Sequence, residues 1–180
     1  MTGIALTEVE FRPLLEADFP MLTGWLAEPH VRKFYQKMPV SLADVASEYG
    51  AAVRGEEPSH CHLAIHEDAL FAYLQCYRNG DYPEWANLIG VEDGISVDLY
   101  VGAPKFLSKG FGRAALSLYL ERVAFPLYPD ETRVYIAHER INASALRCSQ
   151  AVGFRPLRGF LEDGFENILL VTERSIEWLS

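Results

Sequence analysis

Hydrophobic residues recur along the chain with two periods, and the two periods alternate. Short apolar or alternating runs predict strands at residues 9–15, 61–65, 70–77, 94–101, 132–137, 154–161 and 168–173. Apolar residues spaced three and four apart predict helices at residues 16–26, 30–36, 41–55, 114–125 and 142–153. Because strands and helices alternate in this order, the pattern predicts a mixed α/β domain around one central sheet.

Capping and turn residues predict where these elements end. Ser41 is expected to be a helix N-cap with Asp44 in the first turn, and Gly153 is placed to end the last helix. Clusters of turn-forming residues predict loops at residues 67–68, 79–83 and 162–164. No repeat or linker interrupts the order, so residues 1–180 are expected to form a single domain.

The segment from Phe106 to Arg113, Phe-Leu-Ser-Lys-Gly-Phe-Gly-Arg, has the composition of a phosphate-binding loop. It joins a predicted strand to a predicted helix. The first N–H groups of a helix lack internal partners and carry partial positive charge. Glycines let the backbone approach an anion closely, and Lys109 and Arg113 add formal charge. The segment therefore predicts binding of a phosphate-containing ligand.

The composition is ordinary for a globular protein, but its charge balance is acidic. The 180 residues include 25 acidic and 16 basic side chains, for a net charge of −9. Because nucleic-acid binders carry basic patches, nucleic acid is not an expected partner, whereas an acidic cleft would concentrate a cationic small molecule. The alternative is that the charge only keeps the protein in solution. No segment approaches the roughly 20 apolar residues that span a bilayer, and no secretory pattern is seen, so a cytoplasmic protein without membrane attachment is expected.

Cysteine and histidine spacing gives no disulfide or metal signature. The widely spaced cysteines, without a CxxC pair, indicate reduced thiols at Cys61, Cys76 and Cys148. Histidines at even spacing would share one strand face, namely His60, His62 and His66. They match no complete ligand set, and Cys61 would point the other way, so no metal is expected.

Two segments, in order along the chain, resemble the acetyl-CoA-binding motifs of the GNAT N-acetyltransferases. The loop 106–113 resembles the family's Gln/Arg-x-x-Gly-x-Gly loop, which grips the pyrophosphate of coenzyme A. Residues 142–154 resemble the family's Asn-x-x-Ala…Gly-Phe helix and strand, which lie along the pantetheine arm. The resemblance covers nearly the whole domain. It implies the GNAT (acyl-CoA N-acyltransferase) fold, a central mixed, mostly antiparallel and splayed sheet flanked by helices.

Within this superfamily the chain is similar to the aminoglycoside 6'-N-acetyltransferase group. The shared features are Trp25-Leu26 before Pro-His, the pair Phe34-Tyr35, the helix start 41–45, the strand end 75–77 and the strand 94–102. The resemblance implies that acetyl-CoA donates an acetyl group to a primary amine of a cationic small molecule, such as an aminoglycoside, in a ternary complex. It therefore implies a role in antibiotic resistance, with the protein acting as a monomer or homodimer.

The resemblance also implies which residues contact acetyl-CoA. In the strand, loop and helix start these are Leu99, Tyr100, Val101, Leu107, Ser108, Lys109, Gly110, Phe111, Gly112 and Arg113. Asn142 and Ala145 are implied in the second motif. Leu107 replaces the usual Gln or Arg, and Ser108 replaces a usual glycine. Since backbone N–H groups make the main grip, weaker binding rather than its loss is expected.

Direct acetyl transfer needs a group that takes a proton from the amine and an N–H that faces the oxyanion. Asp98, within an apolar strand, is the candidate base or the carboxylate that orients the amine; the alternative is an aspartate satisfied by water or a backbone N–H. A backbone N–H near Leu99 or Tyr100 is expected to hold the oxyanion. Ser149 stands where the family commonly has a tyrosine acid, and a serine hydroxyl is a much poorer acid than a phenol, whose pKa is about 10. Another group, Tyr100 or a water, then supplies the proton, or the thiolate leaves unassisted; Ser149 is kept as a catalytic candidate by its position. His138 is a further candidate base, with a solvated loop histidine as the alternative.

The acceptor is expected to contact a mixture of carboxylates and aromatic rings. Asp81, Glu84 and Trp85 are predicted in a loop between strands, where charge pairing and cation–π contact suit a polyamine. Phe34 and Tyr35 are predicted to wall the acceptor pocket. The alternatives are a solvated turn with its Trp on the core, and aromatic residues that belong to the core.

Two other functions stay open on the same fold. The acceptor could be a protein N-terminus, a lysine side chain or a siderophore intermediate. The chain could also be a non-catalytic module that senses acyl-CoA, for which Ser149 in place of tyrosine is the main support.

Overall fold

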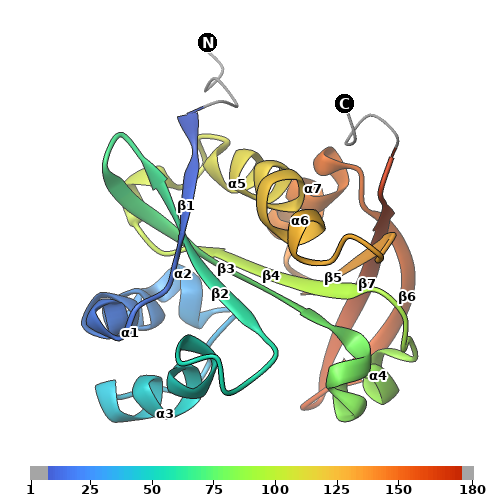
Figure 1. Cartoon of the computed structure of the whole chain (residues 1–180), viewed down its shortest axis with the longest axis horizontal. Helices are drawn as coiled ribbons and strands as arrows, with labels where there is room; N and C mark the ends of the chain where they lie inside the picture. The colour runs from blue at the N-terminus through green and yellow to red at the C-terminus, as the bar shows by residue number, and fades with distance from the viewer. Residues whose placement is uncertain (1–7, 176–180) are drawn as a thin grey trace. The chain divides into compact units, whose positions relative to one another are not determined.

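The computed structural model describes residues 8–175, and its mixed α/β fold confirms the prediction (Figure 1). The strands are β1 (Glu10–Pro13), β2 (His60–His66), β3 (Ala69–Arg78), β4 (Ile95–Val101), β5 (Arg133–Glu139), β6 (Arg155–Glu162) and β7 (Phe165–Glu173). Their hydrogen-bonded order is β1-β2-β3-β4-β5-β7-β6. The helices are α1 (Phe19–Ala27), α2 (Pro29–Arg32), α3 (Leu42–Val53), α4 (Pro83–Ile89), α5 (Phe111–Tyr119), α6 (Phe125–Leu127) and α7 (Ala143–Val152).

The described chain divides into two compact units. The first contains residues 8–75 and 99–115, and the second contains residues 76–98 and 116–175. The strands β3 and β4 and the helix α5 each begin in one unit and end in the other.

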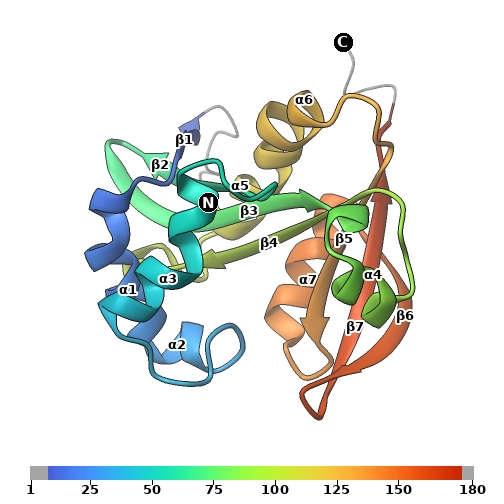
Figure 2. The ribbon, with the colours of Figure 1, turned by 60° about the horizontal axis from the view of Figure 1, so that its bottom comes forward.

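The first unit packs α1 and α3 side by side (Figure 2). Helix α3 begins as predicted, because Ser41 Oγ accepts from the Asp44 N–H at 3.2 Å and Asp44 Oδ2 accepts from the Ser41 N–H at 2.7 Å. Its apolar face meets the core through Val45 and Tyr49, each at most 8% exposed. The turn between β2 and β3 is also as predicted, with positive φ at Glu67 and Asp68, as hairpin turns require.

Gly102 follows β4 and lies directly under an indole ring. Its N–H donates to the Phe71 carbonyl at 2.8 Å, which fixes the backbone. A Cβ at this position would lie 2.0 Å from the Trp25 ring. Trp25 is itself only 8% exposed, so the ring cannot move into open solvent without losing its packing. Only glycine fits here.

In the second unit the parallel strands β4 and β5 share a short ladder. Their register comprises two pairs, Ile95↔Val134 and Ser96↔Tyr135, while both strands run on beyond them. By contrast, β5 pairs with β7 along its whole length, from Arg133↔Glu173 to Glu139↔Asn167. Helix α7 packs on β5 (Figure 2) and ends as predicted at Gly153, whose φ is +115°.

Among residues 8–175, strand β6 ends the hydrogen-bonded order and pairs only with β7. Its residues are exposed apart from the partly buried Phe160. The register shifts between Pro156 and Arg158, which places a β-bulge at Leu157.

Two elements differ from the sequence-based prediction. Residues 83–89 form the helix α4 where a loop was expected, because Pro83 occupies the first turn, and Ala86 and Ile89 are buried. The predicted helix end at Phe125 is also wrong, since the helix continues into α6 through Pro126. A π-helical turn at Leu120–Ala124 precedes Pro126, and a wide turn gives the proline ring room that a regular α-turn lacks.

Candidate functional site

The predicted phosphate loop is held by buried aromatic rings at both ends while its tip is exposed. Phe106 and Phe111 are each 7% exposed, and their rings lie 4.9 and 5.3 Å from that of Phe71. Between them, Ser108, Lys109 and Gly110 are exposed. The aromatic anchors therefore present this backbone to solvent.

The backbone N–H groups of residues 108–113, which we call the amide cradle, have the freedom that anion binding needs. The neighbouring N–H groups of Leu107 and Ala114 donate to the carbonyls of Pro104 and Gly110. Among the described residues, no backbone hydrogen bond outside regular elements uses an N–H of residues 108–113 as donor. Those of Phe111 to Arg113 lie in the first turn of α5, where no internal acceptor exists. Arg113 is exposed, and Lys109 Nζ donates to the Lys105 carbonyl at 2.7 Å.

Ser108 adopts a left-handed conformation, with φ at +58°. Such a φ is unfavourable for a residue with a Cβ, so replacing Ser108 by Gly should raise the free energy of unfolding by about 0.5–1 kcal/mol. Urea denaturation would measure this change. The same replacement at Ser47, inside α3, should instead lower it by about 0.5 kcal/mol; a loss of stability at both positions would contradict the expectation.

Near the end of β4, the ring of Tyr100 belongs to a cluster of tyrosines. The Tyr100 ring stacks on Tyr73 at 5.2 Å and lies 4.4 Å from Tyr35. Its buried hydroxyl has no hydrogen-bond partner among the described residues, and burial raises the pKa of Tyr100 well above its usual value. Tyr100 is therefore poorly suited to give up a proton. The Val101 carbonyl accepts from His30 Nε2 at 2.8 Å.

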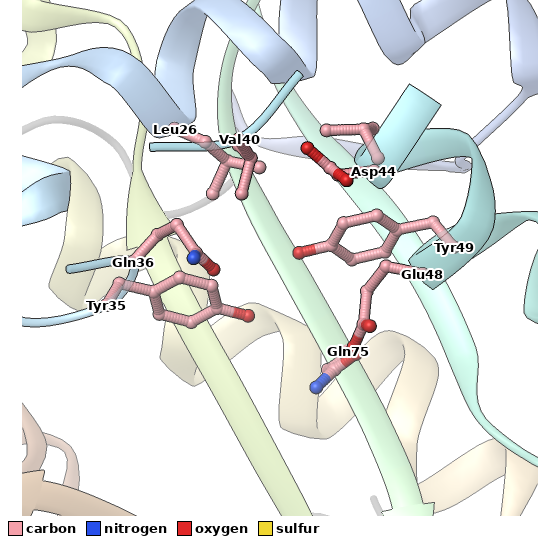
Figure 3. Close-up of a pocket in the computed structure, with 9 residues that line it drawn as sticks. Leu26, Tyr35, Gln36, Val40, Asp44, Glu48, Tyr49 and Gln75 are labelled. Carbon is pink, nitrogen blue, oxygen red and sulfur yellow. The ribbon is translucent and has the colours of Figure 1, made fainter. Parts of the chain in front are cut away.

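A pocket of about 370 Å³ lies beside this cluster in the first unit (Figure 3). Tyr35 and Tyr49 face each other across it, and Asp44 and Glu48 reach it from α3. The Gln75 side chain is oriented by Tyr73, whose hydroxyl donates to Gln75 Oε1 at 2.7 Å. The lining residues are Leu26, Tyr35, Gln36, Val40, Asp44, Val45, Glu48, Tyr49 and Gln75. None of these nine is cationic, so we call this the acidic pocket.

Asp44 and Glu48 are one helical turn apart, where two like charges oppose helix formation. Hydrogen bonds from the Ser41 backbone and then its side chain hold the pKa of Asp44 below its usual value, so this carboxylate stays charged. The acidic pocket thus presents fixed negative charge beside two aromatic rings, an environment that suits an ammonium group. The sequence prediction missed both carboxylates as ligands; their like-charge spacing was the available signal.

Only one of the two predicted aromatic walls lines this pocket. Tyr35 lines the acidic pocket. Phe34 is not among the lining residues; its partly buried ring lies under Lys33, with Nζ 5.1 Å from the ring centre.

Asp98 lies in the second unit, partly buried, among other carboxylates and aromatic rings. Burial, followed by the charge of Asp98, raises the pKa of Tyr77 well above its usual value. Burial also raises the pKa of Glu162, with further contributions from Asp163, Asp98 and Glu139. Asp98 and Glu162 are therefore close enough to interact. Glu162 is a candidate contact for the acceptor amine that the sequence prediction missed.

Trp85 is partly buried on α4, and its indole N–H begins a chain of hydrogen bonds to the buried residues Ser96 and Asn79. Its Nε1–H donates to Ser96 Oγ at 3.0 Å, and Ser96 Oγ donates to Asn79 Oδ1 at 2.6 Å. The ring packs edge-on against Phe160 at 5.9 Å. Asp81 and Glu84, predicted with Trp85 to contact the acceptor, are both exposed. Asp81 lies in the turn before α4, and Glu84 lies on α4.

The second predicted cofactor motif forms α7 as expected. Asn142 caps the helix, and its Oδ1 accepts from the Ala145 N–H at 3.2 Å. This bond occupies the Ala145 N–H, so the Asn142 side chain can offer its amide nitrogen to a ligand. One turn before Gly153, Ser149 is 1% exposed, and its Oγ lies 2.7 Å from His138 Nε2 on β5.

Two partly buried histidines should make the protein acid-sensitive. Burial lowers the pKa of both His62 and His138 to about 4. Because the unfolded chain, with a pKa near 6.5, binds these protons more readily, stability should be full above about pH 6.5 and fall toward pH 4, by at most about 3 kcal/mol per histidine. Urea denaturation at several pH values would test this. His138→Gln should flatten the profile in that window; an unchanged slope would contradict the assignment.

Within residues 8–175, no three His, Cys, Asp or Glu side chains gather as a metal-binding group. Across the same residues, no helix combines the length and apolarity needed to cross a bilayer.

Comparison with protein families gives a match over most of the chain. Residues 14–160 match the model described as an acetyltransferase (GNAT) domain. This range includes the amide cradle, α7 and the acidic pocket.

Solved structures share the fold at low sequence identity. Aminoglycoside acetyltransferase AAC(6')-Ib in complex with coenzyme A is 22% identical, with a TM-score of 0.76 over 92% of this chain and 95% of that one. Spermidine N-acetyltransferase from Vibrio cholerae, in complex with CoA and spermine, is 13% identical, with a TM-score of 0.74 over 97% and 99%. An uncharacterized protein from Bacillus halodurans is 19% identical, with a TM-score of 0.81 over 92% and 83%.

Proposed function

The chain belongs to the GNAT acetyltransferase domain family, and we propose that it transfers the acetyl group of acetyl-CoA to a primary amine of a small polycation. An aminoglycoside is the acceptor class that we favour, which would make the protein an antibiotic-resistance enzyme. Residues 1–180 would act as a single catalytic domain, in the cytoplasm, as a monomer or homodimer.

The amide cradle supports the choice of donor. N–H groups without an internal acceptor at a helix start, with the exposed Lys109 and Arg113 beside them, suit the diphosphate of coenzyme A. Backbone groups of Leu99 and Val101 would contact the pantetheine arm, as would Asn142. Leu107, partly buried, would line the same arm.

The acidic pocket is the observation that carries the acceptor assignment. Two carboxylates and two tyrosines around about 370 Å³, without a cationic side chain, match a small molecule with several ammonium groups. A peptide N-terminus carries one ammonium group and needs a groove for its backbone. AAC(6')-Ib structures with kanamycin and with ribostamycin share this fold, which supports the same acceptor class.

Within the second unit, Asp98 would take the ammonium proton or orient the amine, and Asp81, Glu84, Trp85 and Glu162 would be further acceptor contacts. Ser149 would assist the leaving thiolate, because the resemblance places it at the position of the family's tyrosine acid. Because transfer needs no covalent intermediate, donor and acceptor would be bound together.

Binding and activity assays with the purified protein distinguish this function from its alternatives. Isothermal titration should show acetyl-CoA binding, and thiol release should be fastest with aminoglycosides in a panel that includes spermidine, lysine and peptides. Turnover of peptides alone would establish a protein N-acetyltransferase. Binding without turnover of any amine would indicate a sensing module.

Neutralising the two carboxylates of the acidic pocket tests the acceptor assignment. The double variant Asp44→Asn, Glu48→Gln should raise KM for the amine about 10–100-fold because two charge pairs are lost, while KM for acetyl-CoA stays unchanged. Steady-state kinetics would measure both. The double variant Glu57→Gln, Glu121→Gln removes two exposed carboxylates outside the pocket and is the control for net charge. Equal effects of the two changes would show that only long-range attraction is at work.

A further inference from the structure

The side chains of His138 and Ser149 form a hydrogen bond within the second unit. Ser149 lies on the buried face of α7, and His138 lies on β5, beyond the last residue that pairs with β4. The distance from Nε2 to Oγ is 2.7 Å. A serine inside a helix commonly donates to the carbonyl four residues earlier, but here its oxygen is engaged by the imidazole.

The protonation of the imidazole decides what the serine can do. Burial keeps His138 uncharged at neutral pH, so the ring has one N–H and one lone pair. With the proton on Nε2, the ring donates to Ser149 Oγ, and the serine O–H is left for a third group. With the proton on Nδ1, Ser149 donates to the ring, and only its lone pairs face outward.

We propose that His138 is a positioning residue that holds the Ser149 hydroxyl as a hydrogen-bond donor to the leaving sulfur of coenzyme A. The inference rests on the proposed acetyl transfer. The amine nitrogen bonds to the thioester carbonyl carbon, the C–S bond breaks, and its electron pair stays on sulfur. The ammonium proton passes to Asp98 or water before attack, and the nitrogen loses a second proton to water as the amide forms. The thiolate takes its own proton from solvent after release. Ser149 stabilises the sulfur charge without giving up its proton, so its weak acidity is no obstacle.

Kinetics of four variants test this role. Ser149→Ala and His138→Leu should each lower kcat about 10-fold, the range for a hydrogen bond to a charged group, with KM for acetyl-CoA unchanged. The double variant should lose no more than either single one, because both remove the same interaction. His138→Gln keeps an N–H donor and should stay within about threefold of wild type. Ser144→Ala, on the exposed side of α7, is the matched control.

A spectroscopic measurement tests the same idea without turnover. Heteronuclear NMR of the imidazole nitrogens should show the His138 proton on Nε2. A proton on Nδ1, or wild-type kcat in Ser149→Ala, would overturn the positioning role and leave the transferase assignment intact. Failure of the wild-type protein to acetylate any amine would instead overturn the proposed function.

Discussion

Replacing Asp98 by Asn is expected to lower kcat/KM for the amine about 100-fold, the usual contribution of a general base. The amide cannot accept the ammonium proton, so only the small fraction of free amine would react. Activity of the variant should therefore rise steeply between pH 7 and pH 9, as that fraction grows. Steady-state rates of thiol release at several pH values would measure both effects.

Asp68→Asn is the matched control for this variant. It makes the same chemical change in the β2–β3 turn, where Asn tolerates the positive φ of +63°. Its activity should equal that of the wild type. If Asp98→Asn kept more than a third of wild-type activity, Asp98 would be a structural aspartate of the sheet, as the sequence alone also allowed.

Replacing Gly102 by Ala is expected to lower the free energy of unfolding by about 3 kcal/mol, the upper end for overpacking a core. The new methyl group would lie 2.0 Å from the buried Trp25 ring, so either the indole or the chain after β4 must shift. The midpoint of urea denaturation would measure the loss.

Gly24→Ala provides a control of opposite sign. Gly24 is exposed within α1, and no atom lies within 4 Å of a Cβ built there. Alanine should therefore raise stability by up to about 1 kcal/mol through helix propensity. Equal stability of the two variants would mean that Trp25 moves aside without cost.

Most elements could be predicted from sequence because local residues define their ends. Ser41 and Asp44 cap one another, Glu67 and Asp68 form a two-residue turn, and Gly153 takes the left-handed conformation. In each case the deciding interaction spans a few residues. Helix α4 was missed because Asn-Gly-Asp-Tyr-Pro has turn composition, whereas its stability comes from distant partners of Trp85 such as Ser96 and Phe160.

The candidate site was predictable only in part, for the same reason. The amide cradle is one contiguous segment, and its glycines and basic residues could be recognised directly. The acidic pocket brings Tyr35 together with Glu48 and Gln75, and nothing local to any of them indicates the others. The contact between His138 and Ser149 likewise depends on how α7 packs on β5.

The exposed strand β6 affects whether the protein aggregates at high concentration. A free strand edge can recruit a second chain and seed aggregates. Here Pro156 lacks an N–H, the bulge at Leu157 interrupts the repeat, and Arg155 and Arg158 would repel an identical neighbour. These three features lie within four consecutive residues. Concentrated samples should therefore resist fibre growth at the β6 edge, even though Leu161 and Phe165 are exposed to solvent.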